Sequence, residues 1–214
     1  MQLKIVMALS GAVLLLYLVV HMIGNLKIFF GGEALDTYAH WLREVGEPAL
    51  PAQGMLWIVR VVLLVAVVSH IVAATILARR ARAARPVRYA HRRPVQTSYA
   101  SRTMRWGGVI ILLFVIYHLL HMTVGSVHPD FVHGDVYRNI VVGFRVWPVT
   151  AFYVVAMVAL GFHLRHGVWS MLQTLGASHP KWDATRKAAS TAFAVVVTLG
   201  FVAVPIAVLF GFVK

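Results

Sequence analysis

Residues 106–125 read WGGVIILLFVIYHLLHMTVG, a stretch without a single charged side chain. An α-helix needs about 20 apolar residues to cross the hydrocarbon core of a bilayer. Four further apolar stretches of similar length lie at residues 3–24, 55–78, 148–169 and 188–213. A water-soluble domain does not tolerate five such stretches, so we predict an all-α integral membrane protein that forms one bundle of five transmembrane helices.

The net charge of +13 is distributed asymmetrically between the loops. Arginines crowd the loop between the second and third stretches, and more basic residues lie between the fourth and fifth. Most acidic residues lie in the other two loops. The positive-inside rule therefore places the N-terminus in the cytoplasm and the C-terminus outside. The segments 33–51 and 126–146 then lie at the outer surface, where we expect them to be partly helical. The basic residues are Arg79, Arg80, Arg82, Arg85, Arg88, Arg92, Arg93, Arg102 and Arg105 in the first loop, and Lys181, Arg186 and Lys187 in the second.

Two absences from the sequence limit the chemistry of the chain. It has no cysteine, which excludes thiolate-bound iron–sulfur clusters, covalently attached c-type haem and disulfides. No Asp or Glu falls within an apolar stretch, so a transmembrane carboxylate relay has no candidate residue and a proton pump is disfavoured. Imidazole remains as the obvious metal ligand.

Four of the five apolar stretches carry a histidine: His21, His70, His118 and His163. A buried imidazole is costly in hydrocarbon, which indicates that these residues hold something. At about 1.5 Å per helical residue, the alternating helix directions place His21 and His118 in the outer half of the membrane. The same reasoning places His70 and His163 in the inner half. The pattern predicts two layers, roughly 10–15 Å apart along the membrane normal.

Two histidines at one depth on separate helices are what a six-coordinate, bis-imidazole haem iron requires. The pattern therefore favours two b-type haems. For any single residue the competing interpretation is an interhelical hydrogen bond. His121 and His166 lie one turn from His118 and His163, and either could replace its neighbour as ligand. Otherwise they are expected beside the haem or its propionates, together with Arg165.

These residues also resemble a known family, the five-helix, di-haem cytochrome b membrane anchor of succinate:quinone oxidoreductases (succinate dehydrogenase and fumarate reductase). The resemblance covers nearly the whole chain. It implies a multi-pass protein of the bacterial inner (plasma) membrane in which the first four spans each supply one haem ligand, the first paired with the third and the second with the fourth. The motifs that carry it are HMIGN at residues 21–25, Ser69-His70, RWGG at residues 105–108, Tyr117-His118, and FHLRHGVW at residues 162–169.

The aromatic–histidine pairs favour His118 over His121 and His163 over His166. His166 itself departs from the neutral polar residue expected there, which keeps the fourth ligand open. The resemblance further implies partners on the cytoplasmic face, a flavoprotein subunit that oxidises succinate and an iron–sulfur subunit. Electrons would pass through the inner and then the outer haem to a quinone, expected to be menaquinone.

A quinone needs an apolar slot and one or two polar groups at its carbonyls. Candidates are Asn25, His40 and Glu44 near the outer haem, and Ser98 and Arg102 near the inner face. Two alternatives belong to other classes. One is the haem b anchor of another quinone-linked complex, of the formate dehydrogenase, hydrogenase or nitrate reductase type. The other is a haem-free membrane scaffold or transporter subunit whose histidines make interhelical hydrogen bonds.

Overall fold

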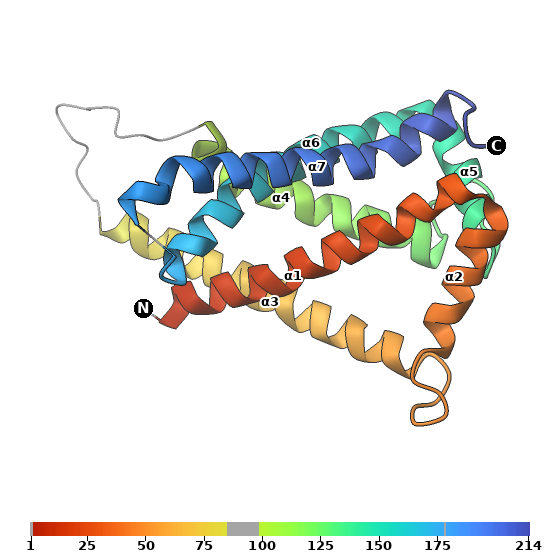
Figure 1. Ribbon diagram of the computed structural model, residues 1–214, viewed down its shortest axis with the longest axis horizontal. Helices are drawn as coiled ribbons and strands as arrows, with labels where there is room; N and C mark the ends of the chain where they lie inside the picture. The colour runs from red at the N-terminus through yellow and green to blue at the C-terminus, as the bar shows by residue number, and fades with distance from the viewer. Residues whose placement is uncertain (1, 85–98, 178) are drawn as a thin grey trace.

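The computed structural model describes residues 2–84, 99–177 and 179–214, with side chains throughout except at 99–103. Helices account for most of this part of the chain, which contains no β-strand (Figure 1). Within these described residues, five helices are long and apolar enough to cross a membrane. The predicted all-α architecture with five potential spans is confirmed.

The five long helices run along the long axis of the molecule, with the N-terminus and the C-terminus at opposite ends (Figure 1). This is the arrangement that an odd number of crossings requires. Their bounds are α1 (Gln2–Leu26), α3 (Gly54–Ala83), α4 (Tyr99–Leu119), α6 (Trp147–Thr174) and α7 (Asp183–Leu209). Short helical segments extend three of them: η1 (Lys27–Phe30) follows α1, the π-helical η2 (Leu120–Val124) follows α4, and η3 (Pro180–Trp182) precedes α7.

Two shorter helices lie at the end of the bundle that carries the C-terminus (Figure 1). They are α2 (Gly32–Glu44) and α5 (Val136–Arg145), within the two segments predicted to lie at the outer surface. A carboxylate joins them across the sequence: Oδ1 of Asp36 accepts the backbone N–H groups of Val136 and Tyr137, at 3.1 and 3.0 Å. A negative charge at the N-terminus of α5 also suits the helix dipole.

The fifth long helix begins at Asp183, five residues before the predicted start of the span at residue 188. Asp183 forms ion pairs with Arg186 and Lys187, at 3.1 and 2.7 Å, one helical turn further on. These charged residues lie just before the apolar stretch, and their i,i+3 and i,i+4 pairs stabilise the first turn of the helix. Apolarity thus located the membrane span, whereas local ion pairing decided where the helix begins.

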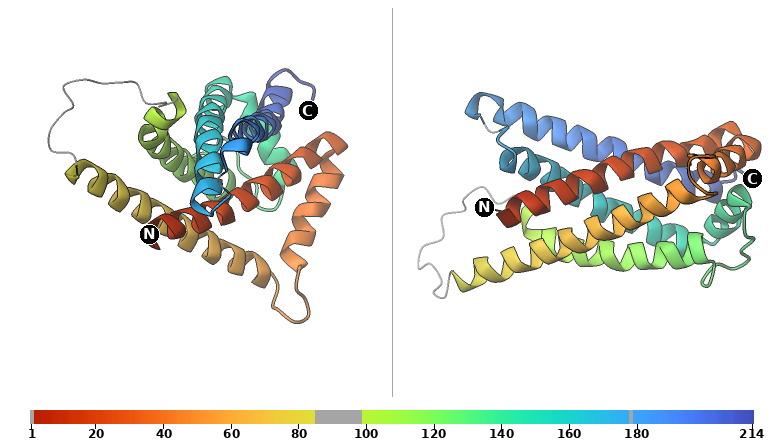
Figure 2. Two further views of the ribbon diagram at one scale, coloured as in Figure 1. Left: turned by 60° about the vertical axis from the view of Figure 1, so that its left-hand side comes forward. Right: turned by 90° about the horizontal axis from the view of Figure 1, so that it is seen from below.

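The core lies between α1, α4, α6 and α7, with α6 packed most extensively against α7. Small residues allow close approach there. A Cβ added at Gly161 of α6 would collide with Thr198 of α7, and one added at Gly200 of α7 would collide with Met22 of α1. By contrast, α3 packs mainly against α1, at the edge of the bundle (Figure 2). Its Leu64 is 65% exposed, as expected for a side chain that faces lipid.

Candidate functional site

The structure brings the four span histidines together in two pairs. The ring of His21 on α1 lies 5.9 Å from that of His118 on α4, between centroids. The ring of His70 on α3 lies 6.3 Å from that of His163 on α6. These are the two pairs expected from helix direction and depth. Each pair joins two different helices across the interior of the bundle.

The separations suit a metal between the rings. Imidazole nitrogens bind transition metals at about 2.0–2.1 Å, and adding the distance from nitrogen to ring centroid gives about 6.3 Å between two rings on opposite sides of one metal atom. Both observed separations, 5.9 and 6.3 Å, are close to this value. In their residue type and ring separation, both pairs are therefore compatible with a bis-imidazole haem iron.

The two pairs lie at different depths along α1. The ring of His70 rests against Gly11, where an added Cβ would lie 3.3 Å from its Cε1 atom. His21 follows ten residues later on the same helix (21 − 11 = 10). At the helical rise this spacing corresponds to about 15 Å, which agrees with the separation predicted between the layers.

In the inner layer, α1 orients the imidazole of His70. Its Nδ1 lies 3.2 Å from the backbone carbonyl oxygen of Met7 and 3.4 Å from the hydroxyl of Ser10. With Nδ1–H donating to that carbonyl, Nε2 keeps its lone pair for a metal. The Nδ1 of its partner His163 is buried and has no hydrogen bond within the described chain.

The other two inner candidates lie beside this pair rather than within it. His166 is half-buried, with its ring 5.8 Å from that of Trp169. Arg165 is exposed and donates from Nε to the hydroxyl of Thr191 on α7, at 3.1 Å. Of the two neighbouring histidines on α6, His163 is the one whose ring meets His70.

In the outer layer, aromatic rings surround His21 and His118. His21 stacks on Tyr17 with 5.3 Å between centroids and lies 5.9 Å from Phe201 of α7. His118 stacks on Phe114, one turn earlier, at 5.8 Å. Both imidazoles therefore have aromatic rings as close neighbours.

Tyr153 of α6, which the sequence analysis did not single out, contacts both outer-layer histidines of α4 and η2. Its hydroxyl lies 3.2 Å from Nδ1 of His118 and 2.9 Å from Nδ1 of His121. The available signal was chemical, because a tyrosine inside an apolar span needs a hydrogen-bond partner for its hydroxyl.

His121 occupies a different environment from His118. It is fully buried in the π-helical segment η2, and its ring stacks on that of His128 at 4.9 Å. A Cβ added at Gly143 of α5 would lie 2.9 Å from the Cε1 of His121. His121 thus packs toward α5 and α6, whereas His118 is the histidine whose ring meets His21.

The structure places the outer quinone candidates in different surroundings. Asn25 is half-buried, one turn beyond His21 on α1. His40 and Glu44 form an i,i+4 pair on α2 at 3.8 Å, with side chains 75% and 65% exposed. Of the inner candidates, Ser98 and the side chain of Arg102 lie outside the described residues.

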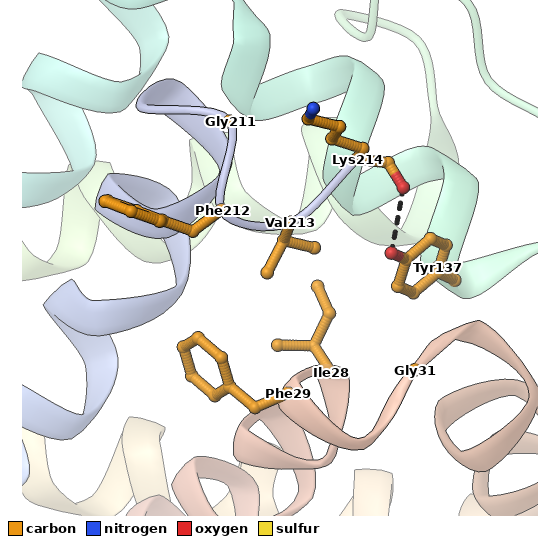
Figure 3. Close-up of a pocket in the computed structure, with 8 residues that line it drawn as sticks. All are labelled: Ile28, Phe29, Gly31, Tyr137, Gly211, Phe212, Val213 and Lys214. Carbon is orange, nitrogen blue, oxygen red and sulfur yellow. Dashed lines mark hydrogen bonds between the residues drawn. The ribbon is translucent and has the colours of Figure 1, made fainter.

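An open pocket of about 500 Å³ lies at the end of the bundle that carries the C-terminus, between η1, α5 and the C-terminal segment (Figure 3). Ile28, Phe29, Phe212 and Val213 are among the residues that line it. At its rim the Tyr137 hydroxyl donates to the backbone carbonyl of Lys214 at 2.9 Å. Sequence reasoning did not find this pocket, because its walls come from opposite ends of the chain.

Comparison with known proteins identifies the family. The family model for the succinate dehydrogenase/fumarate reductase transmembrane subunit matches residues 78–203, which are 126 (203 − 78 + 1) of the 214 residues. No curated protein and no solved structure matches the chain. The matched region contains His118 and His163, whereas His21 and His70 precede it. Since the match covers more than half of its length, the chain belongs to the succinate dehydrogenase/fumarate reductase transmembrane subunit family.

Proposed function

We propose that this chain is the di-haem cytochrome b anchor of a succinate:quinone oxidoreductase. The observation that carries the proposal is the pairing of four histidines from four spans, at ring separations of 5.9 and 6.3 Å. Family membership supports the enzyme complex, and the histidine geometry supports the haem content.

In this function the chain holds two haems b and binds a quinone. When bound, the haems supply one-electron transfer between the inner and outer faces of the membrane. His70 and His163 ligate the inner iron, and the Met7 carbonyl fixes the ring orientation of His70. His21 and His118 ligate the outer iron among the rings of Tyr17, Phe114 and Phe201. No dicarboxylate chemistry falls to this chain.

The partners follow from the family, and the orientation follows from the positive-inside rule. A flavoprotein subunit and an iron–sulfur subunit would dock on the basic, cytoplasmic face, close to the inner layer. The quinone, expected to be menaquinone, would accept electrons near the outer layer. Asn25, His40 and Glu44 remain its candidate contacts there, and the aromatic pocket around Ile28 begins about two helical turns beyond His21.

Haem content tests the proposal. Membranes that contain the wild-type chain should give a dithionite-reduced b-type spectrum with two haems per polypeptide. His70→Ala and His118→Ala should each retain one haem, because each removes an axial ligand from one layer. His40→Ala, at an exposed position on α2, is the matched control and should retain both. A colourless wild-type protein would overturn the proposal in favour of a haem-free scaffold. Full haem content in both span variants would overturn the assignment of His70 and His118 as haem ligands.

Co-purification distinguishes the complexes. The anchor of a succinate:quinone oxidoreductase should bring with it a flavoprotein and an iron–sulfur subunit with succinate-reducible haem. Haem reduction by formate or hydrogen, or oxidation of the reduced haem by nitrate, in place of reduction by succinate would assign the chain to another respiratory complex.

A further inference from the structure

The hydroxyl of Tyr153 lies within hydrogen-bonding distance of both His118, in the outer layer, and the fully buried His121. Tyr153 itself is 5% exposed. Its ring meets those of Phe114 and Phe144 edge-on, at centroid distances of 5.0 and 4.8 Å. Edge-to-face packing on both sides fixes the direction of the hydroxyl.

The hydrogen atoms of this arrangement can be assigned by counting donors. A histidine that binds iron through Nε2 carries its proton on Nδ1, so His118 donates to the Tyr153 oxygen. The single O–H of Tyr153 is then free to donate to Nδ1 of His121, which must hold a lone pair. The proton of His121 therefore resides on Nε2, a buried atom with no hydrogen-bond partner within the described residues. The hydrogen bonds form one directed chain from His118 through Tyr153 to His121.

We propose that Tyr153 is a positioning residue for the outer haem: it holds His118 in the tautomer and ring orientation that iron ligation requires, and it couples this ligand to His121. The inference rests on the proposed function, because it takes His118 as an iron ligand. An acceptor on the distal nitrogen of a ligating imidazole makes the ligand more basic. The second hydrogen bond, to His121, polarises the hydroxyl and strengthens its role as acceptor.

The inner layer provides an internal reference. There the corresponding acceptor for His70 is the backbone carbonyl of Met7 on α1, at 3.2 Å. No substitution at Tyr153 removes that carbonyl. A change at Tyr153 should therefore affect the outer haem selectively, whereas general loosening of the bundle would affect both.

The test is a potentiometric titration of both haems in the assembled membrane protein. In Tyr153→Phe, the midpoint potential of the outer haem should become more positive while that of the inner haem stays unchanged, because a less basic ligand stabilises the oxidised iron less. Tyr117→Phe is the matched control. Its ring also stacks on His121, at 5.5 Å, but its hydroxyl makes no hydrogen bond within the described chain.

A second pair of variants examines His121, the last residue of this series of hydrogen bonds. His121→Leu removes the acceptor for the Tyr153 hydroxyl and should shift the outer potential in the same direction. His121→Asn keeps an oxygen acceptor near the Nδ1 position and should remain close to the wild type. The double variant Tyr153→Phe/His121→Leu should shift no further than Tyr153→Phe alone, because both act through one hydroxyl.

The outcomes separate the two proposals. A wild-type protein without haem would refute the proposed function. Loss of the outer haem in His121→Leu with its retention in His118→Ala would show that His121 is the ligand and would overturn the inference. Two results would overturn the inference and leave the proposed function intact, provided that both haems are present. One is an outer-haem potential that does not change in Tyr153→Phe, and the other is an equal shift in the potentials of both haems.

Discussion

At the scale of single residues, capping and hydrogen-bonding contacts connect parts of the chain that are far apart in sequence. Asp36 on α2 accepts two N–H groups at the start of α5, one hundred residues away in sequence (136 − 36 = 100). Asp135 accepts a third, from the backbone N–H of Arg138 at 3.0 Å. The N-terminus of α5 is therefore held by one local and one distant carboxylate. This helix in turn forms the wall behind His121 through Gly143.

Asp36→Ala should destabilise the outer end of the bundle by about 0.5–2 kcal/mol, the usual cost of losing a helix cap. Thr37→Ala is the matched control, because it lies next along α2, is exposed and forms no side-chain hydrogen bond within the described chain. Thermal unfolding in detergent measures the difference. Equal midpoints for the two variants would contradict a capping role for Asp36.

At the scale of helices, close approach between α6 and α7 depends on small residues. Without a hydrophobic driving force in lipid, helices associate through van der Waals packing, and glycine permits the shortest distances. Gly161 and Gly167 both lie on α6, but only Gly161 faces a neighbour. A Cβ at Gly161 would collide with Thr198, whereas a Cβ at Gly167 would meet nothing within 4 Å.

Gly161→Ala should therefore destabilise the bundle by about 1–3 kcal/mol, the typical cost of overpacking. Gly167→Ala should be neutral or slightly stabilising, because alanine favours the helix and the site is open. Retention of bound haem during heating in detergent gives the comparison. If the two variants lost haem at the same temperature, the close contact between Gly161 and Thr198 would not limit the stability of the bundle.

The π-helical turn η2 is the other decisive element. It begins at Leu120, two residues after His118, and carries His121. A π-turn changes the direction in which successive side chains point. His118 and His121 are one turn apart in sequence, yet one ring meets α1 and the other packs against α5 and α6.

At the scale of the whole molecule, the two ends of the bundle differ in character. The C-terminal end carries α2, α5 and the aromatic pocket, whereas the N-terminus lies at the other end with the connection between α6 and α7 (Figure 1). The C-terminal end of α3, with Arg79, Arg80 and Arg82, and the start of α7, with Arg186 and Lys187, belong to this second end. The positive-inside rule predicts that this end faces the cytoplasm.

The absence of cysteine makes this orientation directly testable. Val132 lies just before α5, and Ala177 lies in the connection between α6 and α7. Both are exposed, so each can be replaced by cysteine as a labelling site. A membrane-impermeant maleimide should label Val132→Cys in intact cells, and Ala177→Cys only after permeabilisation. The reverse pattern would invert the predicted topology and place the partner subunits on the other face.

The sequence by itself determined the five helices, and it predicted the depth of the four span histidines. Apolar length and loop charge are local properties, so they could be read without knowing how the helices pack. The pairing of His21 with His118 and of His70 with His163 followed from helix direction, and the structure shows these rings in proximity. Their role as haem ligands stays a prediction.

Only the tertiary structure decided which groups surround those histidines. The contacts of Tyr153 with His118 and His121, of Asp36 with α5, and of Phe212 with the Ile28 pocket join residues from distant parts of the chain. Such contacts depend on the rotation of each helix about its axis and on one π-turn. Interhelical packing sets both, and hydropathy carries no information about either.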